Sequence, residues 1–286
     1  MATLREIKQR IKSIKSTQQI TKAMKMVAAA KMRRAQERMF AARPYAGKIK
    51  ELIQHLAASA EGAQSPLLQV RPVKRLRLVV ITADRGLCGA FNSHIIRNAV
   101  NECATYVDQE VSMICVGKKG YDFFRKRDYQ IAQQFSGIFH DLQYSYADQI
   151  AQSLIRDFVE DRIDAVRLIY NEFKSVANQQ LVVEDLLPLK LDDFEETTPT
   201  DYLYEPSQDA LLQALLPKYI RMQVWRALLE SNASEQAARM IAMENATDNA
   251  SELIRTLTLQ YNKARQAAIT KEILEIVGGA EALKAT

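Results

Sequence analysis

The sequence predicts an α/β protein with two long terminal helices that pair as an antiparallel coiled coil. Between them in the chain lies a central Rossmann-like domain with a mostly parallel sheet. All seven prolines fall between positions 44 and 217, so both flanks lack the strongest helix breaker. Both flanks also repeat apolar or small side chains at alternating spacings of three and four, the period of a coiled-coil seam. In the middle, short apolar runs alternate with helix-like segments, which favours a parallel sheet.

The N-terminal flank predicts one helix that ends near Glu61–Gly62, where glycine supplies a stop. Its seam is formed by Leu4, Ile7, Ile11, Ile14, Gln18, Thr21, Lys25, Ala28, Met32, Ala35 and Met39. Because a proline inside a helix permits a kink or a break, the pattern can restart beyond Pro44. The restarted stripe then consists of Tyr45, Ile49, Leu52 and Leu56.

The C-terminal flank predicts a second helix from about Asp209 to Ile276. Its seam is Met240, Met243, Thr247, Ala250, Ile254, Leu257, Tyr261, Ala264 and Ala268. Upstream of it lies a bulkier apolar stripe of Ile220, Val224, Trp225, Leu228 and Leu229. Long periodic helices with so little apolar surface need a partner in water. We therefore expect the two helices to pair, antiparallel if the middle domain returns the chain to where it left.

The middle of the chain alternates strand-like and helix-like segments. We expect strands at residues 75–82, 111–116, 129–135, 165–170 and 179–186, with helices at 93–107, 119–125 and 146–160. This pattern divides the chain into four parts. They are an N-terminal coiled-coil helix at 1–62, a central domain at 74–195, an acidic, proline-containing connector at 196–208 and a C-terminal coiled-coil helix at 209–286.

Composition and charge exclude several classes of protein. No window of the 286 residues approaches the roughly 20 apolar residues of a membrane-spanning helix, so we expect a soluble or peripheral protein without membrane insertion. The three cysteines have neither disulfide nor zinc spacing, which favours a reducing compartment. Fourteen basic and two acidic residues give positions 1–50 a charge of +12, whereas positions 184–209 carry −8. The modest net charge of +5 therefore arises because an acidic segment at 184–209 partly offsets a strongly basic segment at 1–50.

Motifs for catalysis or for binding a cofactor or metal are weak. The loop with Gly86 and Gly89 follows the first strand, where such folds bind phosphates, but it matches neither GxGxxG nor the P-loop spacing. A simple strand-to-helix turn is the alternative. Cys88 beside Arg85 is either a thiol with a lowered pKa or a small buried side chain. The acidic residues within 192–196 form either a metal loop or, more simply, a solvated connector. We predict no catalytic, cofactor or metal site.

Six strings of sequence resemble the gamma subunit of F-type ATP synthases. They are residues 14–36, 81–92, 234–240, 246–250, 261–273 and 275–280. The resemblance implies a non-catalytic rotor whose coiled coil penetrates a ring of alpha and beta subunits. It also implies that the central domain binds the epsilon subunit and the membrane c-ring. Proton-driven rotation of the shaft then takes the beta catalytic sites through open and closed states, for ATP synthesis or hydrolysis.

The resemblance also implies roles for individual residues. Arg265 and Gln266 match the positions that contact a catch loop of beta. Lys22, Met24 and Lys25 match the coupling segment of the N-terminal helix. The residues that match C-terminal segments influencing coupling are Arg239, Thr270 and Glu272. For Thr270 and Glu272, local contacts within the coiled coil are an equal alternative.

Two other classes of function remain open from the residues alone. A basic coiled coil can bind nucleic acid, although Phe40 and Tyr45 are the only aromatic residues of the basic segment and no reading module is present. An enzyme with a nucleotide in the middle domain is the other alternative. We expect no nucleic-acid partner. The basic N-terminus resembles a transit peptide but continues the seam, so we interpret it as mature protein and expect a peripheral location on the cytoplasmic side of a bacterial inner membrane.

Overall fold

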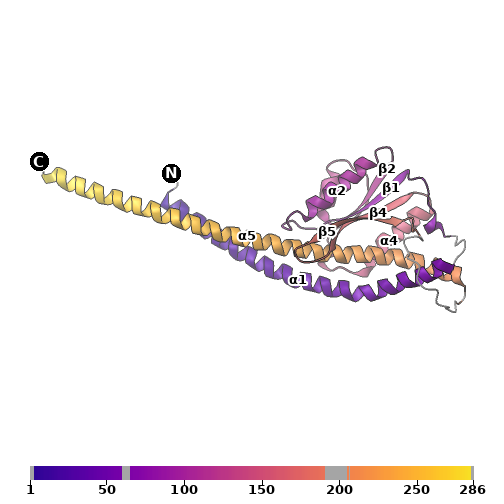
Figure 1. Cartoon of the computed structure of the whole chain (residues 1–286). Helices are drawn as coiled ribbons and strands as arrows, with labels where there is room; N and C mark the ends of the chain where they lie inside the picture. Colours follow the sequence, from indigo (N-terminus) through magenta and orange to yellow (C-terminus); the bar gives the residue numbers. More distant parts are fainter. Residues whose placement is uncertain (1–2, 60–64, 191–204, 206, 285–286) are drawn as a thin grey trace. The chain divides into compact units, whose positions relative to one another are not determined.

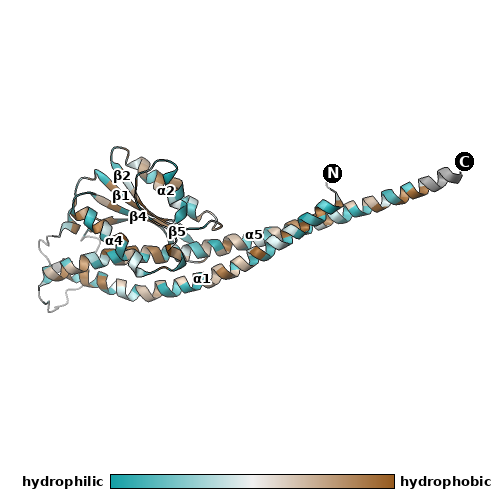
Figure 2. Ribbon diagram, turned by 180° about the vertical axis from the view of Figure 1, so that it is seen from behind, coloured by the Kyte–Doolittle hydropathy of each residue, from teal (hydrophilic) through white to brown (hydrophobic). Residues whose placement is uncertain are grey.

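The computed structural model describes residues 3–59, 65–190, 205 and 207–284 (Figure 1). The chain divides into two compact units. The first unit comprises Met1–Val27 with Met240–Thr286, and the second comprises Ala28–Arg239. The division falls within both terminal helices, so each helix contributes one segment to each unit. The alternation of hydrophobic and hydrophilic residues along both helices is visible in Figure 2.

Helix α1 spans Leu4–Ser59 without interruption. It begins with a capping box, because the Glu6 amide donates to Thr3 Oγ1 at 3.3 Å and the Thr3 amide donates to Glu6 Oε2 at 3.0 Å. All eleven predicted seam positions up to Met39 are buried or half-buried. The predicted end of the helix at Glu61–Gly62 lies outside the described residues.

The predicted restart of the seam beyond Pro44 is wrong at Tyr45 and Leu52, although Ile49 and Leu56 are buried as predicted. Tyr45 and Leu52 are 57% and 41% exposed, whereas Ile53 is completely buried. The helix continues through Pro44, which lies on the exposed side, so the spacing set by the first seam is never reset. The buried and half-buried positions therefore continue in the original rhythm with Met39, Ala42, Ala46, Ile49, Ile53 and Leu56.

Helix α5 spans Gln208–Lys284 and continues beyond the predicted end at Ile276. Every predicted position of its seam from Met240 to Ala268 is buried or half-buried. The upstream stripe is also confirmed, since Ile220, Val224 and Leu228 are completely buried in the second unit. The predicted pairing of the two helices is therefore present within each unit.

The second unit contains a five-stranded sheet in the order β3-β2-β1-β4-β5. The strands are β1 Arg75–Ile81, β2 Glu110–Val116, β3 Ile131–Phe135, β4 Ala165–Phe173 and β5 Gln179–Leu187. The first four are parallel, and β5 is antiparallel to β4. Only residues 174–178 separate β4 from β5, and a connection this short permits a hairpin but not a crossover.

Helices cover both faces of the sheet (Figure 1). One face packs on α2, Phe91–Thr105, and α3, Lys118–Arg125, through a cluster that includes Leu78, Ile95 and Phe124. The other face packs on α4, Tyr144–Val159, and on the α1 and α5 segments of this unit, through a larger cluster. Two short 3-10 helices, η1 Pro66–Leu68 and η2 Ile138–His140, complete the described elements. Alternate residues of each strand point to opposite faces, which is why β1 serves both clusters.

Candidate functional site

Three polar pairs connect α1 to α5 in the first unit. Gln18 Nε2 donates to Ser251 Oγ at 2.7 Å, the Thr21 and Thr247 hydroxyls lie 2.8 Å apart, and Lys25 Nζ lies 2.6 Å from Glu244 Oε1. Positions on α5 fall as those on α1 rise, so the helices are antiparallel. We refer to these three contacts as the polar rungs. Because polar side chains at a seam restrict which positions can face each other, the rungs fix the register of the pair.

A groove of about 410 Å³ lies beside the polar rungs. Two of the predicted coupling residues, Lys22 and Lys25, line it together with Glu244 and Asp248. Met24 is half-buried on the same stretch of α1. The structure therefore brings Lys22 and Lys25 to one surface. The sequence reading missed Glu244, although a carboxylate on the partner helix is what a lysine at a seam position requires.

The N-terminal turns of α1 form a strongly basic face. Arg5, Lys8, Lys12 and Lys15 line a groove of about 550 Å³ with the intervening side chains. None of these four cations makes an ion pair within the described ranges 3–59, 65–190 and 207–284. Their charge is therefore available to an acidic partner surface.

The segment of α5 from Ile269 to Gly278 is exposed on every side. All residues from Ile269 to Gly278 are exposed, including Ile273, Leu274 and Ile276, which are 54%, 65% and 72% exposed. Isolated exposed apolar residues are ordinary, but five large ones within ten residues of one helix indicate a surface for a partner. Figure 2 shows the hydrophobic residues near this end of the helix.

Four of the predicted site residues lie on or next to this exposed end. Arg265 and Gln266 are adjacent and exposed, and Thr270 and Glu272 follow on the exposed surface. The Thr270 hydroxyl donates to the Gln266 carbonyl at 2.9 Å within the helix. These four side chains are thus presented together to solvent.

Arg239 lies in a different setting, in the second unit. Its Nη1 lies 2.7 Å from Glu235 Oε1, and its Nη2 donates to the Gly86 carbonyl at 3.3 Å. Burial raises the pKa of the Glu235 carboxyl, and the Arg239 guanidinium opposes that shift. Arg239 thus attaches the glycine-containing loop after β1 to α5. The structure therefore gives it a role in holding this loop.

The loop after β1 is held by internal hydrogen bonds. Asp84 Oδ1 accepts from the amides of Lys118 at 3.1 Å and Gly137 at 2.8 Å, which follow β2 and β3. Helix N-termini attract anions, and the N-terminus of α3 at Lys118 already faces this carboxylate. Cys88 is 1% exposed, and burial raises the pKa of its thiol. The environment therefore favours the interpretation of Cys88 as a packed side chain over that of a reactive thiol.

A partly buried charged cluster attaches α5 and α1 to the sheet. Arg226 Nη2 lies 2.7 and 2.6 Å from the two oxygens of Glu184, and the Tyr170 hydroxyl donates to Glu184 at 2.9 Å. Glu230 Oε2 accepts from the Phe173 amide at 3.0 Å, and Arg43 of α1 lies 3.7 Å from Glu230 Oε1. We refer to these residues as the charged clamp.

Sequence reasoning missed the charged clamp, although a signal was present. Arg226 lies within the predicted apolar stripe of α5 from Ile220 to Leu229, and Glu230 follows it directly. Charged residues inside such a stripe are rarely buried unless they are paired.

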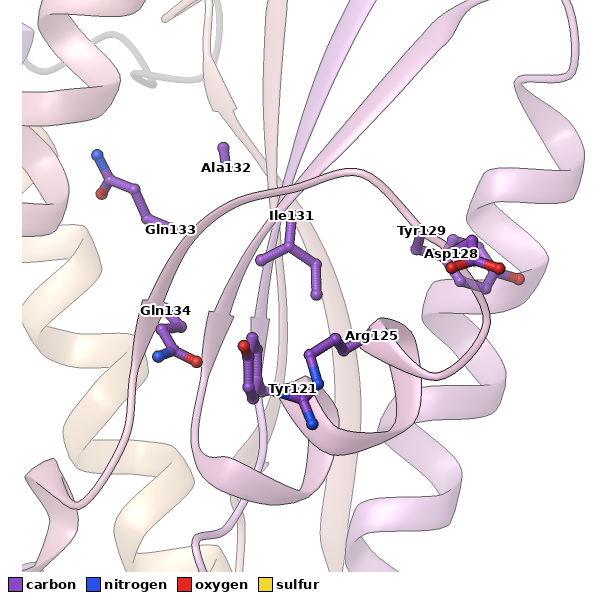
Figure 3. A pocket seen from close by; sticks show the side chains of 8 residues that line it. All are labelled: Tyr121, Arg125, Asp128, Tyr129, Ile131, Ala132, Gln133 and Gln134. Atoms are coloured by element: carbon purple, nitrogen blue, oxygen red, sulfur yellow. The ribbon is translucent and has the colours of Figure 1, made fainter.

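The hollows of the sheet domain do not assemble catalytic groups. One hollow of about 630 Å³ is lined by Tyr121 and Arg125 of α3 and, around β3, by residues 128, 129 and 131–134 (Figure 3). None of the eight side chains that line it is a serine, cysteine or histidine. Within the part of the chain that the structure describes, no cluster of three histidine, cysteine, aspartate or glutamate side chains could hold a metal ion.

Comparison with known proteins agrees with the paired helices and the sheet domain. The protein-family model for ATP synthase matches residues 3–283. The ATP synthase gamma chain of Chlorobium limicola is 53% identical over 290 residues, which cover 99% of this chain and 100% of that one. The chain belongs to the ATP synthase gamma chain family. The gamma chain of Prosthecochloris aestuarii is also similar, at 51% identity over the whole of both chains.

Solved structures share the fold of this gamma chain. A chain in the central stalk and c-ring structure of the Tetrahymena thermophila mitochondrial ATP synthase is 31% identical, with a TM-score of 0.62 over 79% of this chain and 99% of that one. A chain of the Euglena gracilis enzyme in rotational state 3 has the same fold, with a TM-score of 0.70 over 99% of this chain and 95% of that one. The gamma chain is thus a central-stalk subunit of an F-type ATP synthase. None of its described helices is long and apolar enough to cross a membrane.

Proposed function

We propose that this gamma chain is the non-catalytic rotor shaft that couples proton-driven rotation to sequential conformational change at the beta catalytic sites, for ATP synthesis or hydrolysis. The observation that carries the proposal is the first unit, where two antiparallel helices joined by polar rungs continue into an exposed apolar end. A rotating shaft must bind the subunits around it, yet it must also dissociate from each bound position as it turns. Only affinity that differs between states can shift a conformational equilibrium.

The second unit supplies the attachment that torque requires. The charged clamp connects both helices to the sheet, and the bulky apolar core fills the space between them. A rotor whose globular part slipped relative to its helices would lose the work delivered to it. We propose that the central domain, residues 74–195, binds the epsilon subunit and the c-ring, with residues 196–208 as its connector to the C-terminal helix.

The basic face supplies contacts that can form and break. Arg5, Lys8, Lys12 and Lys15 in the first unit, and Lys31 and Arg34 in the second, are exposed and make no ion pair with described residues. We propose that acidic loops of the alpha and beta ring meet these cations. Charge-assisted hydrogen bonds of arginine and lysine with carboxylates are stronger than neutral ones. On an exposed surface they can form and break as the gamma chain rotates.

The proposed contacts with the ring involve the two ends of the first unit. Arg265 and Gln266 contact a catch loop of beta, and Thr270 and Glu272 contribute along the same exposed surface. Lys22, Met24 and Lys25 act at the polar rungs, where a change in register would alter coupling. Arg239 acts by holding the loop after β1 against α5. The gamma chain then sits peripherally on the cytoplasmic side of a bacterial inner membrane, as part of the membrane-associated complex.

The structure favours neither of the two other functions. The Asp84 carboxylate faces the N-terminus of α3, where its charge disfavours a second anion such as a nucleotide phosphate. Nucleic-acid binding lacks a stacking platform on the basic face, where Phe40 is held under the Arg43 guanidinium at 4.8 Å.

The test replaces the two residues proposed to contact the catch loop. In assembled ATP synthase, Arg265→Ala with Gln266→Ala is expected to lower torque and ATP-driven proton pumping, while circular dichroism of the isolated gamma chain stays unchanged. The matched control is Arg255→Ala with Gln260→Ala, a second exposed pair on α5, which is expected to have a smaller effect. Unchanged rotation and pumping in the first variant would contradict the assignment.

A further inference from the structure

A groove with an apolar floor and a basic rim lies between α2 and α3. Its volume is about 500 Å³. Ile96 and Val100 of α2 and Phe123 of α3 form the floor, and Arg97 and Lys119 stand at the rim. No acidic residue lines it. None of the residues that line it belongs to α1 or α5.

The floor is an apolar surface that the fold uses only in part, since Ile96, Val100 and Phe123 pack on the edge of the sheet core and stay half-buried. The buried residues of α2 and α3, including Ile95, Ala99 and Phe124, already face the sheet. Ile96 and Val100 are one turn apart on α2, one position beyond that buried stripe, and both are half-buried. The two helices therefore carry a second apolar stripe that is covered only in part.

The charged side chains that line the groove are both positive. Neither Arg97 nor Lys119 makes an ion pair with any residue that the structure describes. A third cation, Arg127, places its guanidinium 3.8 Å from the centroid of the Phe123 ring. The nearest acidic residue on α2, Glu102, is 2.8 Å from Arg167 and so is already paired.

We propose that this groove docks an amphipathic helix of a partner protein, with an apolar stripe flanked by carboxylates. Two neighbouring helices leave a concave surface into which a third packs by placing its side chains in the groove. Apolar residues spaced by three and four positions would cover Ile96, Val100 and Phe123. Flanking carboxylates would meet Arg97 and Lys119, so charge complementarity selects an acidic partner. An anionic lipid layer would satisfy the cations alone and leave the floor without an apolar partner.

The proposal is tested with the full-length gamma chain and a synthetic helical peptide of about 14 residues. The peptide carries leucines at spacings of three and four, flanked by glutamates, and a matched peptide carries lysines in place of the glutamates. The glutamate peptide is expected to bind at least tenfold more tightly in fluorescence anisotropy. Arg97→Glu with Lys119→Glu should reverse that preference, and because both side chains are exposed the variant should keep its fold.

Two further arms locate the site and identify the occupant. Val100→Glu should abolish binding of either peptide, whereas Lys126→Glu, an exposed control after α3, should leave it nearly unchanged. A photoreactive phenylalanine at position 100 in assembled ATP synthase should cross-link to an acidic helix of one partner. Equal binding of the two peptides would overturn the proposal. Binding of phosphatidylglycerol vesicles through Arg97 and Lys119 without peptide binding would do so as well.

Discussion

The α1–α5 pair is built differently in its two units. In the second unit it is bulky and apolar, with Ile53, Leu216 and Leu228 buried to 1% exposure or less. In the first unit the seam mixes apolar side chains such as Ile7 with small Ala250 and with the polar rungs. The segment in the second unit is fixed as part of a domain core. The segment in the first unit is fixed by the contacts along its seam, and the outer faces of its helices are exposed. The same two helices thus combine an anchored part with a part suited to contact a partner.

The largest expected effect comes from a cavity in the anchored segment. Ile53→Ala removes a completely buried side chain and is expected to lower the free energy of unfolding by about 2–5 kcal/mol. Urea unfolding monitored by circular dichroism measures the loss. Ile20→Ala, at a position 57% exposed in the other unit, should change stability by less than about 0.5 kcal/mol. Equal losses at the two positions would remove the distinction between the segments.

The charged clamp is expected to give the next largest effect. Arg226→Ala leaves Glu184 without its guanidinium partner, and the loss of this partly buried hydrogen-bonded pair should cost about 1–3 kcal/mol. The same unfolding measurement applies. Arg255→Ala, on an exposed part of α5, is the control and should be nearly neutral. A neutral Arg226→Ala would show that the core alone anchors α5.

The paired seam was predictable from sequence, whereas its polar contacts were not. Spacings of three and four locate the seam because the period of an α-helix determines which residues face a partner. Pro44 was misjudged because a proline on the solvent side removes a hydrogen bond without changing the phase of the helix. The antiparallel β5 follows from a short connection, and only a mostly parallel sheet was predicted.

The pairings at the candidate site depend on tertiary structure. Glu244 faces Lys25 only once the register of two segments 219 residues apart is fixed. Asp84 accepts hydrogen bonds from amides that follow two other strands, and no local sequence pattern predicts these contacts. The charged clamp joins residues of β4, β5, α1 and α5 for the same reason.

The free energy of unfolding is expected to depend on pH through Glu235, which lies on α5 in the second unit. Because burial raises the folded-state pKa of Glu235 above its unfolded value, the folded state binds its proton more readily. The cost of the charged carboxylate is therefore complete above the folded pKa and is relieved as the pH falls through it. Glu235→Gln should reduce the gain in stability on acidification, as measured by urea unfolding at several pH values. Glu252→Gln, which is exposed, should leave the profile unchanged.

The smallest expected effect is at the polar rungs. Lys25 and Glu244 are 38% and 45% exposed, so Lys25→Glu alone should cost about 0.2–1 kcal/mol. Adding Glu244→Lys should restore the pair and recover most of that loss. A double-mutant cycle on thermal unfolding measures the coupling. If the exchange recovers nothing, the register of the first unit depends on its small residues instead.

The most direct test asks whether the two helices of the first unit turn as one body. A disulfide between Thr21→Cys and Thr247→Cys joins α1 to α5 where their hydroxyls are 2.8 Å apart. In assembled ATP synthase viewed by single-molecule microscopy, ATP-driven rotation should proceed equally with this bond closed or reduced. A disulfide that stops rotation, with recovery on reduction, would show that the helices move relative to each other and would contradict the rigid shaft.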